Sequence, residues 1–166
     1  ISRSPTDVQP VLDAIVESAA RVCGIDDLGL RLRDGHDFVS PARFGPIAVG
    51  FSHEKISIDE PRFRWIVEHG TLHIPDALAQ NEFPNLGILS RARTFLMVPL
   101  RQQGEVVGTL TARRTEVLPF TSAQIKLLET FADQAVIAME NARLFTDLKA
   151  SLEQQTATAE VLKVIA

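Results

Sequence analysis

Residues 94–114, TFLMVPLRQQGEVVGTLTARR, predict a β-hairpin. The first arm, Thr94–Leu100, is apolar at both alternating sets of positions, and Gly104 provides the turn into the second arm, Glu105–Arg114. A strand that is apolar on both faces is typical of a sheet covered on both sides. Pro99 has no backbone N–H to donate, so we expect an edge position or a bulge there.

The segments before this hairpin predict a helix, a second hairpin and an irregular insert. Apolar residues recur at helical spacing up to Cys23, and Gly24 is suited to end that helix. Leucines then alternate with polar residues over 28–33, and Asp34-Gly35 predicts a turn into a strand over 38–44. The insert contains three short elements, namely a helix from Pro61 to Gly70, a strand over 72–74 and a helix over 86–91.

The last segment predicts one long helix. Thr121 and Gln124 form a capping box, and neither glycine nor proline occurs from Thr121 to Ala166. Such a helix would be about 67 Å long, roughly twice the width of a small domain. Its first half carries an apolar stripe that can pack on the domain, but the stripe of its second half has no sheet beneath it. We therefore predict a homodimer through Phe145, Leu148, Leu152, Ala159 and Leu162.

Composition bounds the class of protein. The chain has 166 residues, 45% of them hydrophobic, which suits a globular domain. A net charge of −4 argues against a nucleic-acid partner, which needs a positive surface. The sequence contains no apolar run of about 18 residues, the length needed to span a membrane. A single cysteine cannot form an internal disulfide. We expect a soluble, cytoplasmic protein, and the first residue, Ile1, suggests a piece of a longer chain.

The order of these elements and several short motifs resemble a GAF domain, a sensory module of signalling proteins. The resemblance spans residues 7 to about 145 and is carried by the following motifs in order: His73-Ile74-Pro75-Asp76, Val98-Pro99-Leu100, Gly104, Val107-Gly108 and Pro119-Phe120-Thr121. It implies an α+β fold, with a six-stranded antiparallel sheet, helices on both faces and a long C-terminal helix. It also implies a sensor domain over 1–145 and a helical linker over 146–166.

The resemblance further implies a non-catalytic sensor that binds a small molecule. Residues 159–165 are similar to the linker that precedes Ser-Arg-Ser-Pro in tandem arrays of such domains, and the chain begins Ile1-Ser2-Arg3-Ser4-Pro5. This suggests one unit of a multi-domain sensor with a histidine kinase or nucleotide cyclase output, as in two-component systems. The alternative is a ligand-free dimerisation spacer, and a third hypothesis is a small enzyme on the same fold.

In this family the ligand lies between one face of the sheet and the helices of the insert. The alternation of the second arm places Val107, Thr109 and Thr111 on one face. Arg43 or Arg113 could pair with an anionic ligand, and the same side chains could equally fill an interior without one. The candidate ligand-binding residues are Phe44, His53, Trp65, Ile88, Phe95, Met97, Thr109 and Thr111.

The motifs of several specialised relatives are missing. The cyclic-nucleotide signature Phe-x-x-x-Asp-Glu is absent, since Lys55 stands four residues before Asp59-Glu60. Cys23 has no adjacent histidine, which argues against a covalent bilin and against cysteine-based reductase chemistry. His53 is the histidine to test as a haem ligand, and we predict no metal site. No nucleophile elbow or phosphate-binding glycine loop occurs, so we expect no catalysis, and the cofactor stays unidentified.

Overall fold

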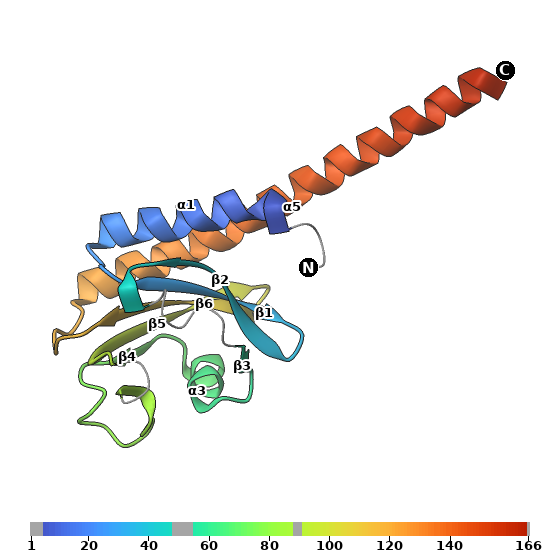
Figure 1. The fold of residues 1–166 in the computed structure, drawn as a ribbon. Helices are drawn as coiled ribbons and strands as arrows, with labels where there is room; N and C mark the ends of the chain where they lie inside the picture. The colour runs from blue at the N-terminus through green and yellow to red at the C-terminus, as the bar shows by residue number, and fades with distance from the viewer. Residues whose placement is uncertain (1–4, 48–54, 88–90, 166) are drawn as a thin grey trace.

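The computed structural model describes residues 5–47, 55–87 and 91–165. It is a sheet with two long helices on one face and a short helix with its connecting segments on the other (Figure 1). The elements in chain order are α1 (Pro5–Cys23), β1 (Leu28–Asp34), β2 (Asp37–Phe44), β3 (Ile56–Ser57), α3 (Pro61–His69), β4 (Leu72–Ile74), β5 (Thr94–Gln102), β6 (Glu105–Arg114) and α5 (Ser122–Ile165).

The sheet has six strands in the order β3-β2-β1-β6-β5-β4, and every neighbouring pair is antiparallel. The predicted α+β architecture, with helices on both faces and a long C-terminal helix, is therefore confirmed. The helix predicted from Pro61 is also present, with Glu60 as its N-cap and Gly70 following its last residue. The short helix predicted over 86–91 lies partly outside the described residues.

Two separate apolar cores lie on the two faces of the sheet. Leu96, Val98 and Leu100 of β5 pack against α1 and α5, whereas Phe95 and Met97 of the same strand belong to the core beneath α3. The first arm of the hairpin is thus apolar on both faces because the sheet is covered on both sides, as predicted. The core beneath α3 also holds Phe38, Phe63 and Ile66, and the rings of Phe38 and Phe63 stack with centroids 4.2 Å apart.

Bulges shift which residues face which core. The pairing of β5 with β6 changes register between Leu100 and Arg101, and Val107 is the extra residue. Val106 consequently packs beneath α3, and Val107 packs against the helix layer. The prediction that Val107 shares a face with Thr109 and Thr111 is therefore wrong. At Pro99 itself β5 has no neighbour opposite β6 among the described residues, because β4 pairs only with residues 95–97.

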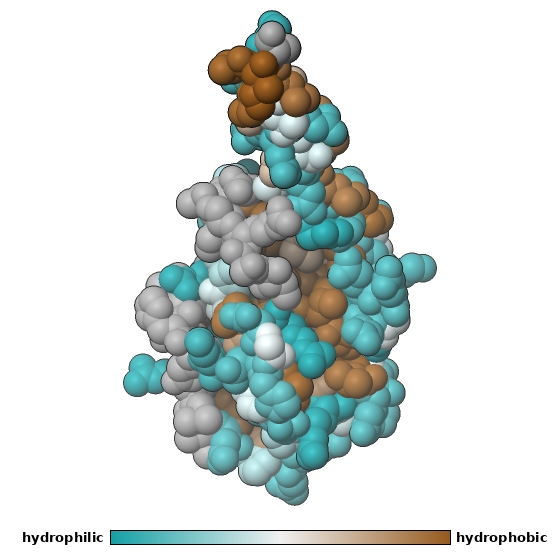
Figure 2. Space-filling model, turned by 90° about the vertical axis from the view of Figure 1, so that its right-hand side faces the viewer, coloured by the Kyte–Doolittle hydropathy of each residue, from teal (hydrophilic) through white to brown (hydrophobic). Residues whose placement is uncertain are grey.

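The long helix α5 extends well beyond the sheet and α1 (Figure 1). Its start is fixed by the predicted capping box, in which Thr121 N donates to Gln124 Oε1 over 2.8 Å and Gln124 N donates to Thr121 Oγ1 over 3.1 Å. Leu128, Ala132 and Ala135 are buried on the domain, whereas residues 148–165 are all exposed. The free end of the helix presents hydrophobic surface (Figure 2), to which Leu162, Val164 and Ile165 contribute.

Candidate functional site: a cavity between the sheet and the insert

A cavity of about 300 Å³ lies between the sheet and the insert, on the face opposite α1 and α5. Its volume is at the lower end of the range for pockets that hold small molecules. Strands β1, β5 and β6 supply one wall, while the start of α3 and the segment over 82–86 supply the other. The lining side chains are Arg31, Ile56, Glu60, Pro61, Arg62, Glu82, Phe83, Pro84, Asn85, Leu86, Phe95, Met97, Thr111 and Arg113.

Strand pairing explains how the wall on the sheet is assembled. Met97 of β5 is the direct partner of Thr111 on β6, so the two side chains lie next to each other on the cavity face. On the other side of Thr111 its partner in β1 is Gly29, which adds no side chain to this face. The thioether of Met97 and the hydroxyl-bearing side chain of Thr111 therefore lie side by side in this wall.

The threonines on this face are buried without hydrogen bonds. Thr111 is 2% exposed and Thr109 is fully buried, and neither Oγ1 has a partner within the described part of the chain. A buried hydroxyl that has lost its water contacts without gaining a partner costs about 1–3 kcal/mol. The Thr111 hydroxyl in the cavity wall is therefore suited to bind a polar group of a ligand.

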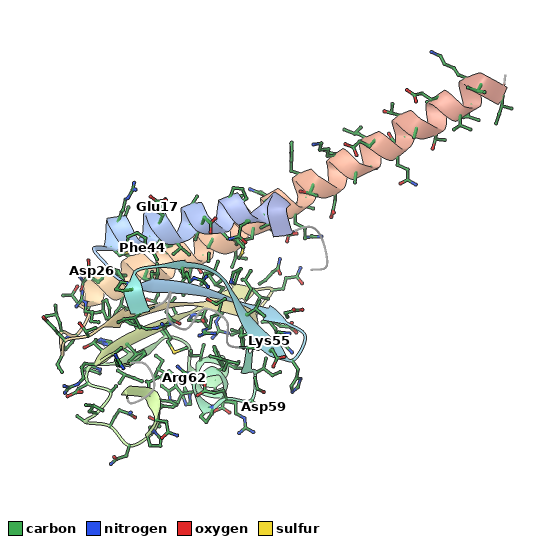
Figure 3. All side chains as sticks on the ribbon, viewed as in Figure 1. Glu17, Asp26, Phe44, Lys55, Asp59 and Arg62 are labelled. Atoms are coloured by element: carbon green, nitrogen blue, oxygen red, sulfur yellow. The ribbon has the colours of Figure 1, made fainter. Side chains whose placement is uncertain are left out.

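Three arginines from three elements line the same cavity. Arg31 of β1 and Arg113 of β6 are each only 7% exposed, and Arg62 extends from the first turn of α3. Burial lowers the pKa of Arg113, attraction by Asp27 raises it, and repulsion from Arg62 lowers it further. In Figure 3, Arg62 lies on α3, on the side of the sheet opposite α1 and α5.

One of these arginines, Arg62, forms a salt bridge with Glu60. Its carboxylate accepts hydrogen bonds from Arg62 Nε over 2.9 and 3.0 Å, and it also caps α3 by accepting from Arg62 N over 3.1 Å. By contrast, Arg113 makes no salt bridge or side-chain hydrogen bond with any of the described residues. The cavity therefore combines an apolar wall, a buried hydroxyl and a buried cation.

A second, more open hollow lies next to this cavity, with a volume of about 420 Å³. Trp65, His73, Asp76 and Phe83 are among its lining residues. The Trp65 ring stacks on His69, with centroids 4.6 Å apart, at the outer end of α3. Among the described residues, Glu82 and Phe83 line both hollows, whereas Trp65 lines the second hollow and not the cavity that holds the arginines.

The sequence matches the model of the GAF domain family over residues 7–139. The chain belongs to the GAF domain family. Members of this family serve as sensory and regulatory modules of signalling proteins, and the resemblance stated from the motifs is confirmed at this level.

Solved structures share the fold of this GAF domain at low sequence identity. The blue-light absorbing form of the PixJ GAF domain from Thermosynechococcus elongatus is 19% identical, with a TM-score of 0.73, covering 93% of this chain and 98% of that one. The second GAF domain of DevS from Mycobacterium smegmatis is 20% identical, with a TM-score of 0.67 and coverages of 87% and 99%.

The same fold also occurs in an enzyme, a type II free methionine-R-sulfoxide reductase from Thermoplasma acidophilum. It is 14% identical, with a TM-score of 0.69, covering 82% of this chain and 95% of that one. In this GAF domain the cysteine, Cys23, is buried in the core of the helix layer, and burial raises the pKa of its thiol. A raised pKa disfavours the thiolate that redox chemistry requires.

The cavity brings together three of the residues predicted to bind a ligand. Phe95, Met97 and Thr111 line it, while Thr109 lies on the same face of β6 but outside the lining. Their role in binding stays a prediction. Arg113, considered from the sequence as a partner for an anion, also lines the cavity, whereas Arg43 is exposed and lines neither hollow.

The other candidates lie elsewhere. Phe44 is 37% exposed and lines neither hollow (Figure 3). A register shift in the pairing of β1 with β2 turns Ala42 toward the helix layer. Residues two apart in a strand share a face, so Phe44 also points away from the cavity. His53 and Ile88 lie outside the described residues. Arg31 was not among the predicted residues, because its alternation with leucines in β1 resembles that of a solvated strand face.

Two predicted absences concern metals and membranes. Within residues 5–47, 55–87 and 91–165, no group of three or more His, Cys, Asp or Glu side chains is arranged to hold a metal ion. Across the same ranges, no helix combines the length and the apolar character needed to cross a bilayer.

His73 connects the second hollow to the long helix. Its Nε2 atom accepts a hydrogen bond from the backbone N of Phe120, over 3.1 Å, just before α5 begins. An imidazole that accepts at Nε2 must be neutral with its proton on Nδ1. Burial, and then the positive charge of Arg114, lower the pKa of His73, which also favours the neutral form.

This contact predicts a pH-dependent stability. The free energy of unfolding should fall as the pH drops below about 6.5, because the unfolded chain takes up a proton on residue 73 before the folded chain does. The fall should end below the lowered pKa of the folded state. His73→Gln keeps an acceptor but cannot titrate, so urea denaturation between about pH 7.5 and pH 5.5 should show a flatter profile than the wild type. His69→Gln, at an exposed histidine, is the control; an equal flattening in both variants would contradict the assignment to His73.

Proposed function

We propose that this GAF domain is a non-catalytic sensor whose cavity binds a small molecule and whose state passes to a paired helix α5. The proposal rests on the cavity itself, which combines apolar side chains, buried guanidinium groups and the buried Thr111 hydroxyl, for which the described residues provide no hydrogen-bond partner. Ligand pockets characteristically combine apolar lining with a few placed polar groups. Residues 1–145 would form the sensor and 146–166 the linker toward a kinase or cyclase output domain.

Hydrogen bonds link α5 to β5, which lines the cavity, and to the segment around β4, which pairs with β5. Thr71 Oγ1, just before β4, donates to Glu129 Oε2 over 2.8 Å, and Gln102 Nε2, at the end of β5, donates to Glu140 Oε2 over 2.9 Å. The contact from Phe120 N to His73 adds a third link at the start of the helix. A ligand that favours one position of β4 and β5 would thereby bias the position of α5.

The alternative of a ligand-free spacer is supported by a different observation. The buried rings of Phe38 and Phe63 stack on each other in the core beneath α3, which shows that side chains alone can fill space on this face. Native mass spectrometry of gently purified protein separates the two proposals. A dimer that carries additional small-molecule mass supports the sensor, whereas a dimer that lacks additional mass in repeated gentle preparations supports the spacer.

The Thr111 hydroxyl gives a second test that needs no knowledge of the ligand. Thr111→Val removes an unpartnered buried hydroxyl at nearly constant shape, so we expect the ligand-free domain to gain about 1 kcal/mol in the free energy of unfolding. The same variant should retain less small-molecule mass in native mass spectrometry. A more stable protein that binds less is the signature expected of a polar group kept for a ligand.

A matched control is available in β5. Thr94 is as buried as Thr111, but its Oγ1 lies 2.7 Å from Pro75 O and 3.0 Å from Glu116 O and accepts a hydrogen bond from Leu118 N. Thr94→Val should therefore lose stability in urea denaturation. If Thr111→Val lost as much as Thr94→Val, the Thr111 hydroxyl would have a protein partner and the proposal would lose its support.

A further inference from the structure

We propose that the cavity selects an anionic ligand, an organic carboxylate or phosphate ester with an apolar body, whose oxyanion is held by Arg113 and Arg31. The inference rests on the proposed function and adds the chemical class of the ligand. It also gives a role to the arginines that are buried in the lining of the cavity.

The strand registers place the two buried arginines on either side of Thr111. Arg113 is two residues after Thr111 on β6, and Arg31 of β1 is the direct partner of Thr109, two residues before it. Residues two apart on a strand lie on the same face, so Arg113 shares the face of Thr111, and Arg31 joins them from the neighbouring strand. A hydroxyl donor flanked by guanidinium groups is an arrangement suited to an oxyanion.

The described lining of the cavity holds three arginines and two glutamates, Glu60 and Glu82, so its net charge is positive and favours an incoming anion. Glu60 is already engaged by Arg62, and no carboxylate among the described residues forms an ion pair with Arg113 within 4.0 Å. Asp27 attracts Arg113 from a distance, but Asp27 Oδ2 also accepts a hydrogen bond from Ile47 N over 2.5 Å, and Arg62 repels Arg113. A buried cation that faces another cation is unfavourable until a negative charge joins them.

The rest of the lining specifies the body of the ligand. Phe83, Leu86, Phe95 and Met97 provide an apolar surface on both walls of the cavity. A fully polar anion such as a free phosphate ion would leave that surface in contact with water. Aromatic and thioether side chains suit a ring or a short hydrocarbon chain attached to the oxyanion. The volume of about 300 Å³ limits the ligand to a small molecule.

Paired probes that differ in charge test the inference on the intact 166-residue chain. Benzoate and phenyl phosphate carry the two forms of oxyanion on a ring, and benzamide is the neutral counterpart of benzoate. Thermal unfolding and titration calorimetry should show that at least one anion binds and raises the midpoint of unfolding, since a ligand of the folded state stabilises it. Benzamide should bind at least about tenfold more weakly, because it cannot form charge-assisted pairs with arginine. Whichever anion binds more tightly identifies the carboxylate or the phosphate as the natural group.

Variants locate the binding at the cavity. Arg113→Met should weaken anion binding by about tenfold or more, the loss expected for one charge-assisted hydrogen-bond partner. Arg113→Lys keeps the charge without the planar fork and should give a smaller loss, which also covers the case in which Arg113→Met does not fold. Arg33→Met, two residues from Arg31 on the exposed end of β1, is the control and should leave binding unchanged within about twofold.

Several results would contradict the proposal of an anionic ligand without contradicting the proposal that the domain is a sensor. Equal affinities of benzamide and benzoate, or equal losses of binding in Arg113→Met and Arg33→Met, would mean that the charge at Arg113 does not select the ligand. Failure of both anions to bind the wild type also overturns the inference. The sensor proposal is judged separately, by the small-molecule mass that the purified protein retains.

Discussion

Replacing Leu148 and Leu152 with glutamate is expected to convert a dimer of this chain into a monomer. Both side chains lie on the free half of α5, where they are 58% and 54% exposed, and they belong to the predicted stripe that includes Phe145 and Leu162. Burial of one leucine in an interface contributes about 1.5–3 kcal/mol, and a two-fold dimer buries each position twice. The dissociation constant should therefore rise by more than about a hundredfold.

Sedimentation at matched concentrations measures this change, and the helix itself offers the control. Ala150→Glu with Ala157→Glu adds the same two negative charges to exposed positions on the opposite side of the helix. That variant should remain a dimer. Equal dissociation of both double variants would assign the effect to charge, and a monomeric wild type would mean that the stripe of α5 is not a dimer interface.

The long helix shows why a partner is expected at all. Over its first turns α5 packs on the sheet, and Leu128, Ala132 and Ala135 are buried there. Beyond the domain its apolar positions continue at steps of three and four, and none of the residues that the structure describes covers them (Figures 1 and 2). Helices in proteins gain most of their stability by packing an apolar face against another surface. A second copy of α5 is the simplest surface with the same length and periodicity.

Local signals predicted the elements of the fold well. The capping box at Thr121, the turn at Gly104 and the two-sided apolar pattern of β5 each depend on neighbouring residues, so they are visible in the sequence. Strand β3 was not predicted, because its two residues, Ile56 and Ser57, are too few to show a pattern. The face occupied by Val107 was predicted wrongly, since an extra residue in a strand reverses the alternation after it.

The candidate site depended on contacts that are distant in the sequence. Arg31 and Arg33 alternate with leucines in the same way, yet Arg31 is buried and Arg33 is exposed. The difference arises because the start of α3 and the segment over 82–86 cover only part of the strand face. No local pattern in β1 reports that cover. The buried arginines, which distinguish this cavity from an ordinary apolar core, therefore became apparent only from the structure.

Phe63→Ala is expected to cause a large loss of stability in the core beneath α3. Phe63 is 1% exposed, stacks on Phe38 and joins α3 to the sheet beside the cavity. Removing a buried phenylalanine side chain costs about 3–5 kcal/mol through lost burial and the cavity left behind. Urea denaturation measures the change, and Val67→Ala on the exposed side of the same helix should cost no more than about 0.5 kcal/mol. Similar losses in the two variants would contradict the packing described for α3.

The same variant separates the two halves of the proposed mechanism. Phe63 belongs to the core beneath α3, whereas α5 packs on the core of the opposite face, to which Leu96, Val98 and Leu110 contribute. Under conditions in which Phe63→Ala remains folded, ligand binding should therefore weaken while dimerisation through the free half of α5 persists. Loss of the dimer in folded Phe63→Ala would mean that the insert and α5 are more tightly coupled than the hydrogen bonds at Thr71, His73 and Gln102 account for. Retention of the dimer would mean that the packing beneath α3 is not required for dimerisation through the free half of α5.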